Sequence, residues 1–219
     1  MKKTFIVANW KSNITDSEAK KWIDEFKNYD SSFTNKEIII CPSFTAFPIL
    51  KSYILNLNSP IKIGAQNISP FAEGAYTGEV SGKQIREFAD YVLIGHSERR
   101  KNFGETDDVL FKKFNLAKES GLIVIYCVQG KETKIPENVD IVAYEPVNAI
   151  GTGNPDSPEN AEEVGAYFKA NFQVSTVLYG GSVTSSNVGS FTKMLNIDGV
   201  LVGKASLDPL EFLQISKNA

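Results

Sequence analysis

Eight short apolar runs, rich in β-branched residues, recur along this chain and alternate with segments whose apolar residues have helical spacing. The runs are residues 5–8, 37–41, 61–65, 91–94, 122–127, 141–144, 176–179 and 199–202. Most of them are continuously apolar, which is typical of strands in a parallel sheet covered by helices. The clearest helical spacing lies in residues 16–28 and 106–120, and Ser157-Pro158 predicts another helix start.

Eight strand and helix pairs in 219 residues predict one (β/α)₈ barrel domain over residues 1–219, near the short end of about 200 to 400 residues for this class. An open, doubly wound sheet is the alternative. It is disfavoured because Asn9-Trp10-Lys11 follows the first strand, where such sheets carry a glycine-rich turn. Only 13 residues separate Cys127 from Ile141. We therefore expect a shortened or missing fifth covering helix, with residues 131–139 extended or forming a single turn.

Composition and charge exclude several classes of protein. With 23 Lys and Arg against 26 Asp and Glu, the chain has no basic face that would suit a nucleic acid. No apolar run reaches the roughly 18 residues that cross a membrane. Asn9 and Lys11 interrupt the apolar start, so we expect a first strand there rather than a signal peptide. The two cysteines cannot form a disulfide framework, which favours a reducing, cytoplasmic compartment.

Polar residues follow five of the predicted strands, at the end of the barrel that carries active sites in this class. They are Asn9 and Lys11, His96, Glu145, Gly180-Gly181-Ser182, and Gly203-Lys204. A lone histidine is often structural and a lone lysine usually lies on the surface. The position of His96 at a strand end favours a chemical role instead. Glu145 directly follows a buried strand, which suits a partly desolvated general base.

Glycines in the turns after the seventh and eighth strands predict a phosphate site. Glycine lets backbone N–H groups approach an anion closely, and these two turns lie where barrels commonly bind phosphate. Residues 199–205 are not a Walker A loop, because three residues rather than four separate the glycines and Ala205 replaces Ser or Thr. Gly151-Thr152-Gly153 matches only half of the G-x-G-x-x-G dinucleotide-binding motif, and it does not follow the first strand, where that motif belongs.

Several motifs, in order from Asn9 to Leu207, resemble those of the triosephosphate isomerase family. They are Asn9-Trp10-Lys11, Gly64-Ala65-Gln66-Asn67, Gly74-Ala75-Tyr76-Thr77-Gly78-Glu79, Gly95-His96-Ser97-Glu98-Arg99-Arg100, Tyr144-Glu145-Pro146-Val147, Ala149-Ile150-Gly151-Thr152-Gly153 and Tyr179-Gly180-Gly181-Ser182-Val183. The resemblance implies interconversion of dihydroxyacetone phosphate and D-glyceraldehyde 3-phosphate through an enediolate, in glycolysis and gluconeogenesis, without a metal or organic cofactor. It also implies a homodimer through the loop from Gln66 to Glu79. Charge and the length of the apolar runs, as argued above, predict no nucleic-acid or membrane partner.

The resemblance implies a role for each site residue. Glu145 would be the base that moves a proton between C1 and C2, and His96 a neutral imidazole that donates a hydrogen bond to the developing oxyanion. Lys11 would supply a fixed positive charge, while Asn9 orients the substrate oxygens. Four backbone N–H groups would hold the phosphate beneath a closing lid of residues 149–153: those of Gly151, Ser182, Gly203 and Lys204.

The chain departs from the family pattern at three places. Asn148 stands where the family usually has a tryptophan at the lid hinge, Gln129-Gly130 where it has Gly-Glu, and Lys204 where it has a second glycine. We expect Asn148 or Tyr144 to bond the backbone of the Gln129-Gly130 turn in compensation.

Two other functions compete with the isomerase. One is a Schiff-base enzyme of another sugar phosphate that uses Lys11 as its nucleophile, since barrels host many reactions. The other is a non-catalytic phosphate-binding or scaffold barrel. An isomerase assay distinguishes the non-catalytic barrel from the isomerase. Borohydride trapping of Lys11 with substrate tests the Schiff-base enzyme.

Overall fold

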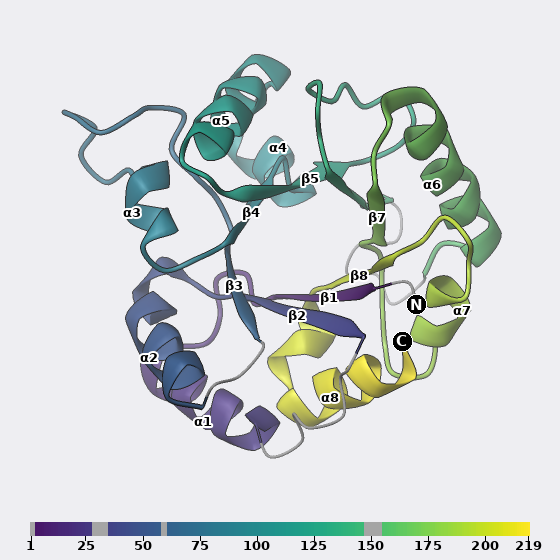
Figure 1. The fold of residues 1–219 in the computed structure, drawn as a ribbon, viewed down its shortest axis with the longest axis horizontal. Helices are drawn as coiled ribbons and strands as arrows, with labels where there is room; N and C mark the ends of the chain where they lie inside the picture. The colour runs from purple at the N-terminus through teal and green to yellow at the C-terminus, as the bar shows by residue number, and fades with distance from the viewer. Residues whose placement is uncertain (1–2, 28–34, 58–60, 147–154) are drawn as a thin grey trace.

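Eight parallel strands close into one barrel in the computed structural model, which describes residues 3–27, 35–57, 61–146 and 155–219 (Figure 1). The strands are β1 (Thr4–Asn9), β2 (Lys36–Cys41), β3 (Lys62–Ala65), β4 (Tyr91–Ile94), β5 (Ile123–Val128), β6 (Ile141–Tyr144), β7 (Thr176–Tyr179) and β8 (Gly199–Val202). Each pairs with the next in chain order, and β8 pairs with β1, Phe5 opposite Gly199. The predicted barrel is confirmed, and the open sheet is wrong because the closed barrel has no free edge strands.

Helices surround this barrel in the order that the chain dictates (Figure 1). They are α1 (Asp16–Lys27), η2 (Phe44–Ala46), α2 (Phe47–Leu57), α3 (Gly82–Arg86), α4 (Ser97–Phe103), α5 (Asp107–Glu119), α6 (Pro158–Phe172), α7 (Val188–Thr192), η3 (Lys204–Leu207) and α8 (Pro209–Asn218). The Ser157 side chain accepts a hydrogen bond from the Asn160 amide, and Pro158 begins α6, as predicted. No helix of the described ranges is long and apolar enough to cross a membrane.

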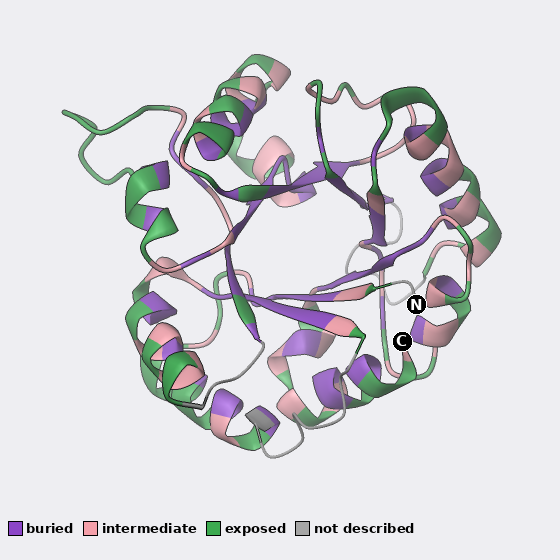
Figure 2. Ribbon diagram, in the orientation of Figure 1, coloured by how far each residue is buried: buried purple, intermediate pink, exposed green. Residues whose placement is uncertain are grey.

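In every strand except β3, alternate residues belong to two separate apolar cores. Val7, Ile39, Leu93 and Ile125 belong to the smaller one, inside the barrel. Their strand neighbours belong to the larger core between the barrel and the helices. The strands are therefore buried on both faces, as Figure 2 shows, and this explains their continuous apolarity.

The segment between β5 and β6 contains turns but no helix, which confirms the missing fifth covering helix. Val139 is 3% exposed within the larger core, and Ile135 packs against the same core. Lys131 forms an ion pair with Glu163 of α6 and lies over the Tyr167 ring. Two apolar side chains therefore replace part of the cover that a helix would give.

A long loop between β3 and α3 extends away from the barrel (Figure 1). Near its tip the rings of Phe71 and Tyr76 stack with centroids 4.2 Å apart, although both side chains are more than 40% exposed. A capping box between Ser81 and Gln84 ends the loop and begins α3. The stacked pair forms an apolar tip that projects into solvent in a single chain.

Candidate active site

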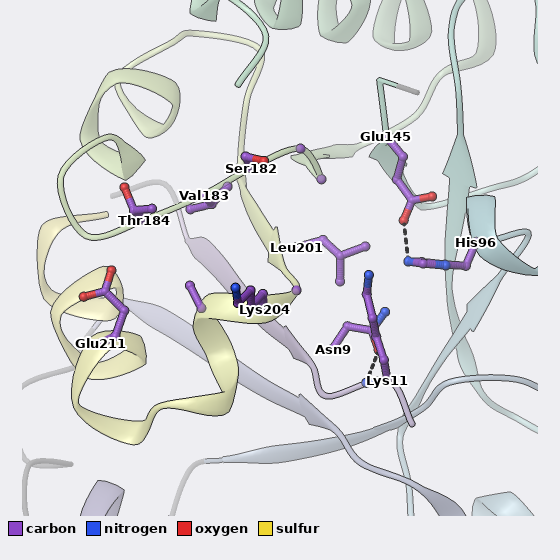
Figure 3. A pocket seen from close by; sticks show the side chains of 14 residues that line it. Asn9, Lys11, His96, Glu145, Ser182, Val183, Thr184, Leu201, Lys204 and Glu211 are labelled. Atoms are coloured by element: carbon purple, nitrogen blue, oxygen red, sulfur yellow. Dashed lines mark hydrogen bonds and ion pairs between the residues drawn. The ribbon is translucent and has the colours of Figure 1, made fainter. Parts of the chain in front are cut away.

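A cavity of about 560 Å³ opens at the C-terminal ends of the strands. Its lining unites every predicted site residue that the structure describes: Asn9, Lys11, His96, Glu145, Ser182, Gly203 and Lys204. Gly151, Asn148 and the lid residues 149–153 lie outside the described residues. Figure 3 shows His96 and Glu145 at one end of the cavity, with Ser182, Thr184, Lys204 and Glu211 toward the other. The cavity thus separates an end with proton-transfer groups from an end built of turns.

The end of β1 places Asn9 and Lys11 in this cavity. Asn9 is 5% exposed, and its side-chain oxygen accepts a hydrogen bond of 3.0 Å from the Lys11 amide. Lys11 has a φ of 53°, a left-handed conformation that costs a non-glycine residue about 1–3 kcal/mol. The Gln66 side chain stabilises it by donating to the carbonyls of Lys11 and Cys41. The Lys11 ammonium forms an ion pair with Glu98.

His96 lies at the N-terminal cap of α4 and is 7% exposed. Its Nδ1 accepts a hydrogen bond of 3.3 Å from the Glu98 amide. A ring nitrogen that accepts cannot also carry a proton, so the proton of a neutral ring is on Nε2. The geometry therefore presents an Nε2–H donor, and this atom lies 3.2 Å from Oε1 of Glu145 (Figure 3).

Glu145 directly follows β6 and is 2% exposed. Its Oε2 accepts a hydrogen bond of 2.8 Å from the Ser97 amide. The Cys127 thiol lies beside this carboxylate: burial, with the charge of Glu145 as a second cause, raises the pKa of Cys127 well above its usual value. The Glu145 carboxylate is thus shielded from solvent and lies against His96.

The turns after β7 and β8 form the opposite end of the cavity, and close packing requires glycine in the turn after β7. A Cβ at Gly181 would clash with the Tyr179 hydroxyl, and one at Gly180 would come within 3.0 Å of Cγ of Glu145. Ser182, Gly203 and Lys204 line the cavity from these turns. Such turns expose backbone N–H groups to an anion.

Sequence reasoning assigned no role to three residues that hold the site together. Gln66 supports the strained Lys11 backbone, Ser97 donates to Glu145, and Glu98 contacts both Lys11 and His96. Ser97 and Glu98 directly follow His96, so their place in that motif was the only signal available. Gln66 is 55 residues from Lys11 in the chain, and only the closed barrel brings them together.

The arrangement is suited to removing a proton next to a carbonyl group. A buried carboxylate, an imidazole N–H donor and an ammonium group converge at one end of the cavity. Such a proton is only weakly acidic, so catalysis needs a positioned base together with preorganised stabilisation of the enediolate. In the part of the chain that the structure describes, no group of three or more His, Cys, Asp or Glu side chains could hold a metal ion.

The triosephosphate isomerase family model matches residues 4–219. The chain belongs to this family. It is 38% identical to the triosephosphate isomerase of Dictyoglomus turgidum over the whole of both chains. It is 37% identical to that of Aquifex aeolicus, over 96% of this chain and 97% of the relative. It is also 38% identical to that of Mesomycoplasma hyopneumoniae, over 99% and 100%. The chain is therefore an aldose–ketose isomerase that interconverts dihydroxyacetone phosphate and D-glyceraldehyde 3-phosphate.

Tyr144 does not compensate for the family's missing hinge contact in the way that we expected. Its hydroxyl donates to Asp156, 2.9 Å away, and accepts from Asn160, so it does not reach the Gln129-Gly130 turn. The expectation was wrong for Tyr144 because Asp156 offers its hydroxyl a charged acceptor. The alternative partner, Asn148, is outside the described ranges.

A carboxylate from a neighbouring residue, Glu132, nevertheless lies against the Gln129-Gly130 turn. The Glu132 side chain folds back so closely that a Cβ at Gly130 would clash with it. The Gln129 amide donates to the Thr133 side chain, 3.0 Å away, which closes the turn. The family's glutamate is thus absent from position 130, but an acidic group two residues later packs against that position.

Proposed function

We propose that Glu145, His96, Lys11 and Asn9 carry out the isomerisation. The observation that supports this most directly is the contact of 3.2 Å between Nε2 of His96 and Oε1 of Glu145, which places an acceptor and a donor of protons side by side at the buried end of the cavity. A triose bound there would have adjacent carbon and oxygen atoms within reach of both groups.

The reaction begins when Glu145 removes one of the two protons on C1 of dihydroxyacetone phosphate. The C–H electron pair forms the C1=C2 double bond, and the carbonyl oxygen on C2 becomes an enediolate oxygen. His96 donates its Nε2–H to this oxygen, and the Lys11 ammonium stabilises its charge. The C1 hydroxyl then gives its proton to the C2 oxygen through His96, which donates its Nε2 proton to one oxygen and recovers a proton from the other. Glu145 returns its proton to C2 as the C1 oxygen becomes the aldehyde carbonyl, so no atom is gained or lost.

Glu145 must first leave the Ser97 amide, because its Oε2 is hydrogen-bonded there. The N–H groups of Ser182, Gly203 and Lys204, with that of Gly151, bind the substrate phosphate. Phosphate binding at the far end leaves the three-carbon chain to span the distance to Glu145 and His96 (Figure 3). This orientation is the main requirement for a near-attack geometry.

Two conservative substitutions test these roles in a coupled isomerase assay. Glu145→Asp retracts the carboxylate by one methylene and should lower kcat by about 10²-fold or more, with a smaller effect on KM. His96→Gln retains a hydrogen-bond donor but loses the imidazole, and should also lower kcat. Turnover of glyceraldehyde 3-phosphate near the parental rate in either variant would show that the assigned roles are wrong.

We also propose that the chain is a homodimer through the loop from Gln66 to Glu79. The exposed Phe71–Tyr76 stack supports this, since paired aromatic rings at a projecting tip are typical of protein contacts. Phe71→Asp should convert the dimer to a monomer in sedimentation experiments, while Phe103→Asp, at an exposed residue of α4, should not. A monomeric parent would contradict the proposal.

A cytoplasmic location and a single domain over residues 1–219 complete the proposal. Cys41 and Cys127 are both buried free thiols, which suits a reducing compartment. The matched region of the family runs from residue 4 to residue 219, which supports one unit. Fractionation of cells with an antibody to the chain tests the location.

A further inference from the structure

The side chain of Lys204 lines the active-site cavity at the end opposite Glu145 and His96 (Figure 3). At this position the resemblance described above leads one to expect glycine, which has no side chain. Lys204 is exposed to the solvent of the cavity. Among the described residues, no hydrogen bond or ion pair engages its ammonium group.

The backbone that carries Lys204 is rigidly held, although its side chain is exposed. Lys204 begins η3, and Ser206 within this turn is fully buried. Both the amide and the hydroxyl of Ser206 donate to the Gly203 carbonyl. The indole N–H of Trp22 in α1 donates to the Ser206 carbonyl, 3.0 Å away. The Lys204 Cα is therefore anchored, and only its side chain has freedom to adjust to a ligand.

Among the described residues that line the cavity, Lys204 is the lysine whose ammonium group has no carboxylate partner. The Lys11 ammonium is already paired with Glu98. Glu211, the other charged residue at the Lys204 end, accepts hydrogen bonds from the amide and the hydroxyl of Ser185. The sequence of residues 147–154 contains no Lys, Arg or His. Among the described residues, a phosphate dianion at this end of the cavity would therefore meet one ammonium group that no carboxylate already neutralises.

We propose that the Lys204 ammonium binds the phosphate group of the triose phosphate and contributes to specificity for phosphorylated substrates. This inference rests on the proposed function, because it assumes that the turns after β7 and β8 are the phosphate end. A charge-assisted contact adds to the backbone N–H groups of the same turns. It also offsets the nearby charge of Glu211, which would otherwise repel the dianion.

The test compares Lys204→Met, which removes the charge at similar length, with Lys204→Arg, which keeps it. The probes are inorganic phosphate as a competitive inhibitor and glyceraldehyde 3-phosphate as the substrate. Lys204→Met should raise the inhibition constant of phosphate and the KM by about tenfold at low salt, with a smaller change in kcat. Lys204→Arg should restore most of the loss, and the difference should shrink at high salt because screening weakens the contact.

Lys193→Met is the matched control, since it removes the same charge from an exposed position at the end of α7, outside the cavity. It should leave the phosphate inhibition constant unchanged. Calorimetric titration with inorganic phosphate provides a second measurement that does not depend on turnover.

Parental phosphate inhibition and KM in Lys204→Met would overturn the inference while leaving the isomerase roles intact. An equal loss in Lys204→Met and Lys204→Arg would also overturn it, because a charge contact should survive in the arginine variant. Failure of the proposed function has a different signature, namely parental turnover in Glu145→Asp or His96→Gln.

Discussion

Glu145 is closely packed against its neighbours, although its carboxylate must leave the Ser97 amide to reach a substrate. Its amide donates to the Val128 carbonyl at 2.7 Å, and its carboxylate accepts from Ser97. Gly180 lies so close that a Cβ there would be 3.0 Å from Cγ of Glu145 and 3.1 Å from the Tyr144 carbonyl. The absence of a side chain at position 180 is therefore part of the site, even though glycine has no chemical group of its own.

Gly180→Ala should lower kcat by about tenfold, because displacing the carboxylate by several tenths of an ångström already impairs a near-attack geometry. KM should change less, since the phosphate end does not depend on this contact. Steady-state kinetics test this, with Gly189→Ala in α7 as the control for a Gly-to-Ala change outside the cavity. Equal kcat values for Gly180→Ala and the parent would mean that Glu145 is not confined by this packing.

At the scale of elements, Asp156 joins β6, β7 and α6 just after the segment that follows Glu145. Its carboxylate accepts from the Tyr144 hydroxyl at the end of β6 and from Asn160 in α6. Its amide donates to the Tyr179 hydroxyl at the end of β7. Burial is the main cause that raises the pKa of Tyr144, and the hydrogen bond to Asp156 adds to it. Two strands and a helix are thus joined through one residue, Asp156, whose carboxylate binds β6 and α6 and whose amide binds β7.

Asp156→Ala should lower the free energy of unfolding by about 1–2 kcal/mol, because it removes the acceptor of a partly buried hydroxyl. It should also lower kcat, since Tyr144 directly precedes Glu145. Asp156→Asn keeps an acceptor oxygen and should retain most of both quantities. Urea unfolding and steady-state assays on the two variants provide the comparison. Identical behaviour of alanine and asparagine would show that the hydrogen bond to Tyr144 is unimportant.

On the scale of the whole molecule, the barrel buries several weak acids in their neutral forms. Burial raises the pKa of Tyr126 and of Tyr179 to about 12, and it raises the pKa of the Cys41 thiol. Ordinary thiols and phenols in an unfolded chain lose their protons near pH 8.5 and pH 10. Above these values the folded chain binds more protons than the unfolded chain, so stability must fall as pH rises.

The free energy of unfolding should therefore be unaffected by these groups below about pH 8 and should decline from about pH 8.5 to pH 12. Each group contributes a slope of up to about 1.4 kcal/mol per pH unit between its unfolded and folded pKa. Urea unfolding at pH 7, 9 and 10.5 measures the decline. Cys41→Ala removes one such acid and should make the decline shallower. A stability that is flat or rising across this range would contradict the burial argument.

Local patterns in the chain were enough for the strands and for the principal site residues. The run at residues 141–144 became β6 with the same bounds, because four consecutive apolar or aromatic residues suit a strand that is buried on both faces. Glu145 and His96 were identifiable because each follows such a run, and parallel strands bring their C-terminal ends to one mouth. The short link after Cys127 likewise predicted a missing helix from length alone.

Contacts between distant segments required the folded barrel, because they depend on which side chains meet across space. Gln66 reaches the Lys11 carbonyl, and Tyr144 bonds Asp156 rather than the Gln129-Gly130 turn. No periodicity encodes such pairings, since many acceptors near a strand end are equally plausible in one dimension. Chain order and apolar spacing therefore specify the barrel and its active end. The positions of donors, acceptors and charges, such as that of Lys204, follow only from closure of the sheet, which fixes their distances.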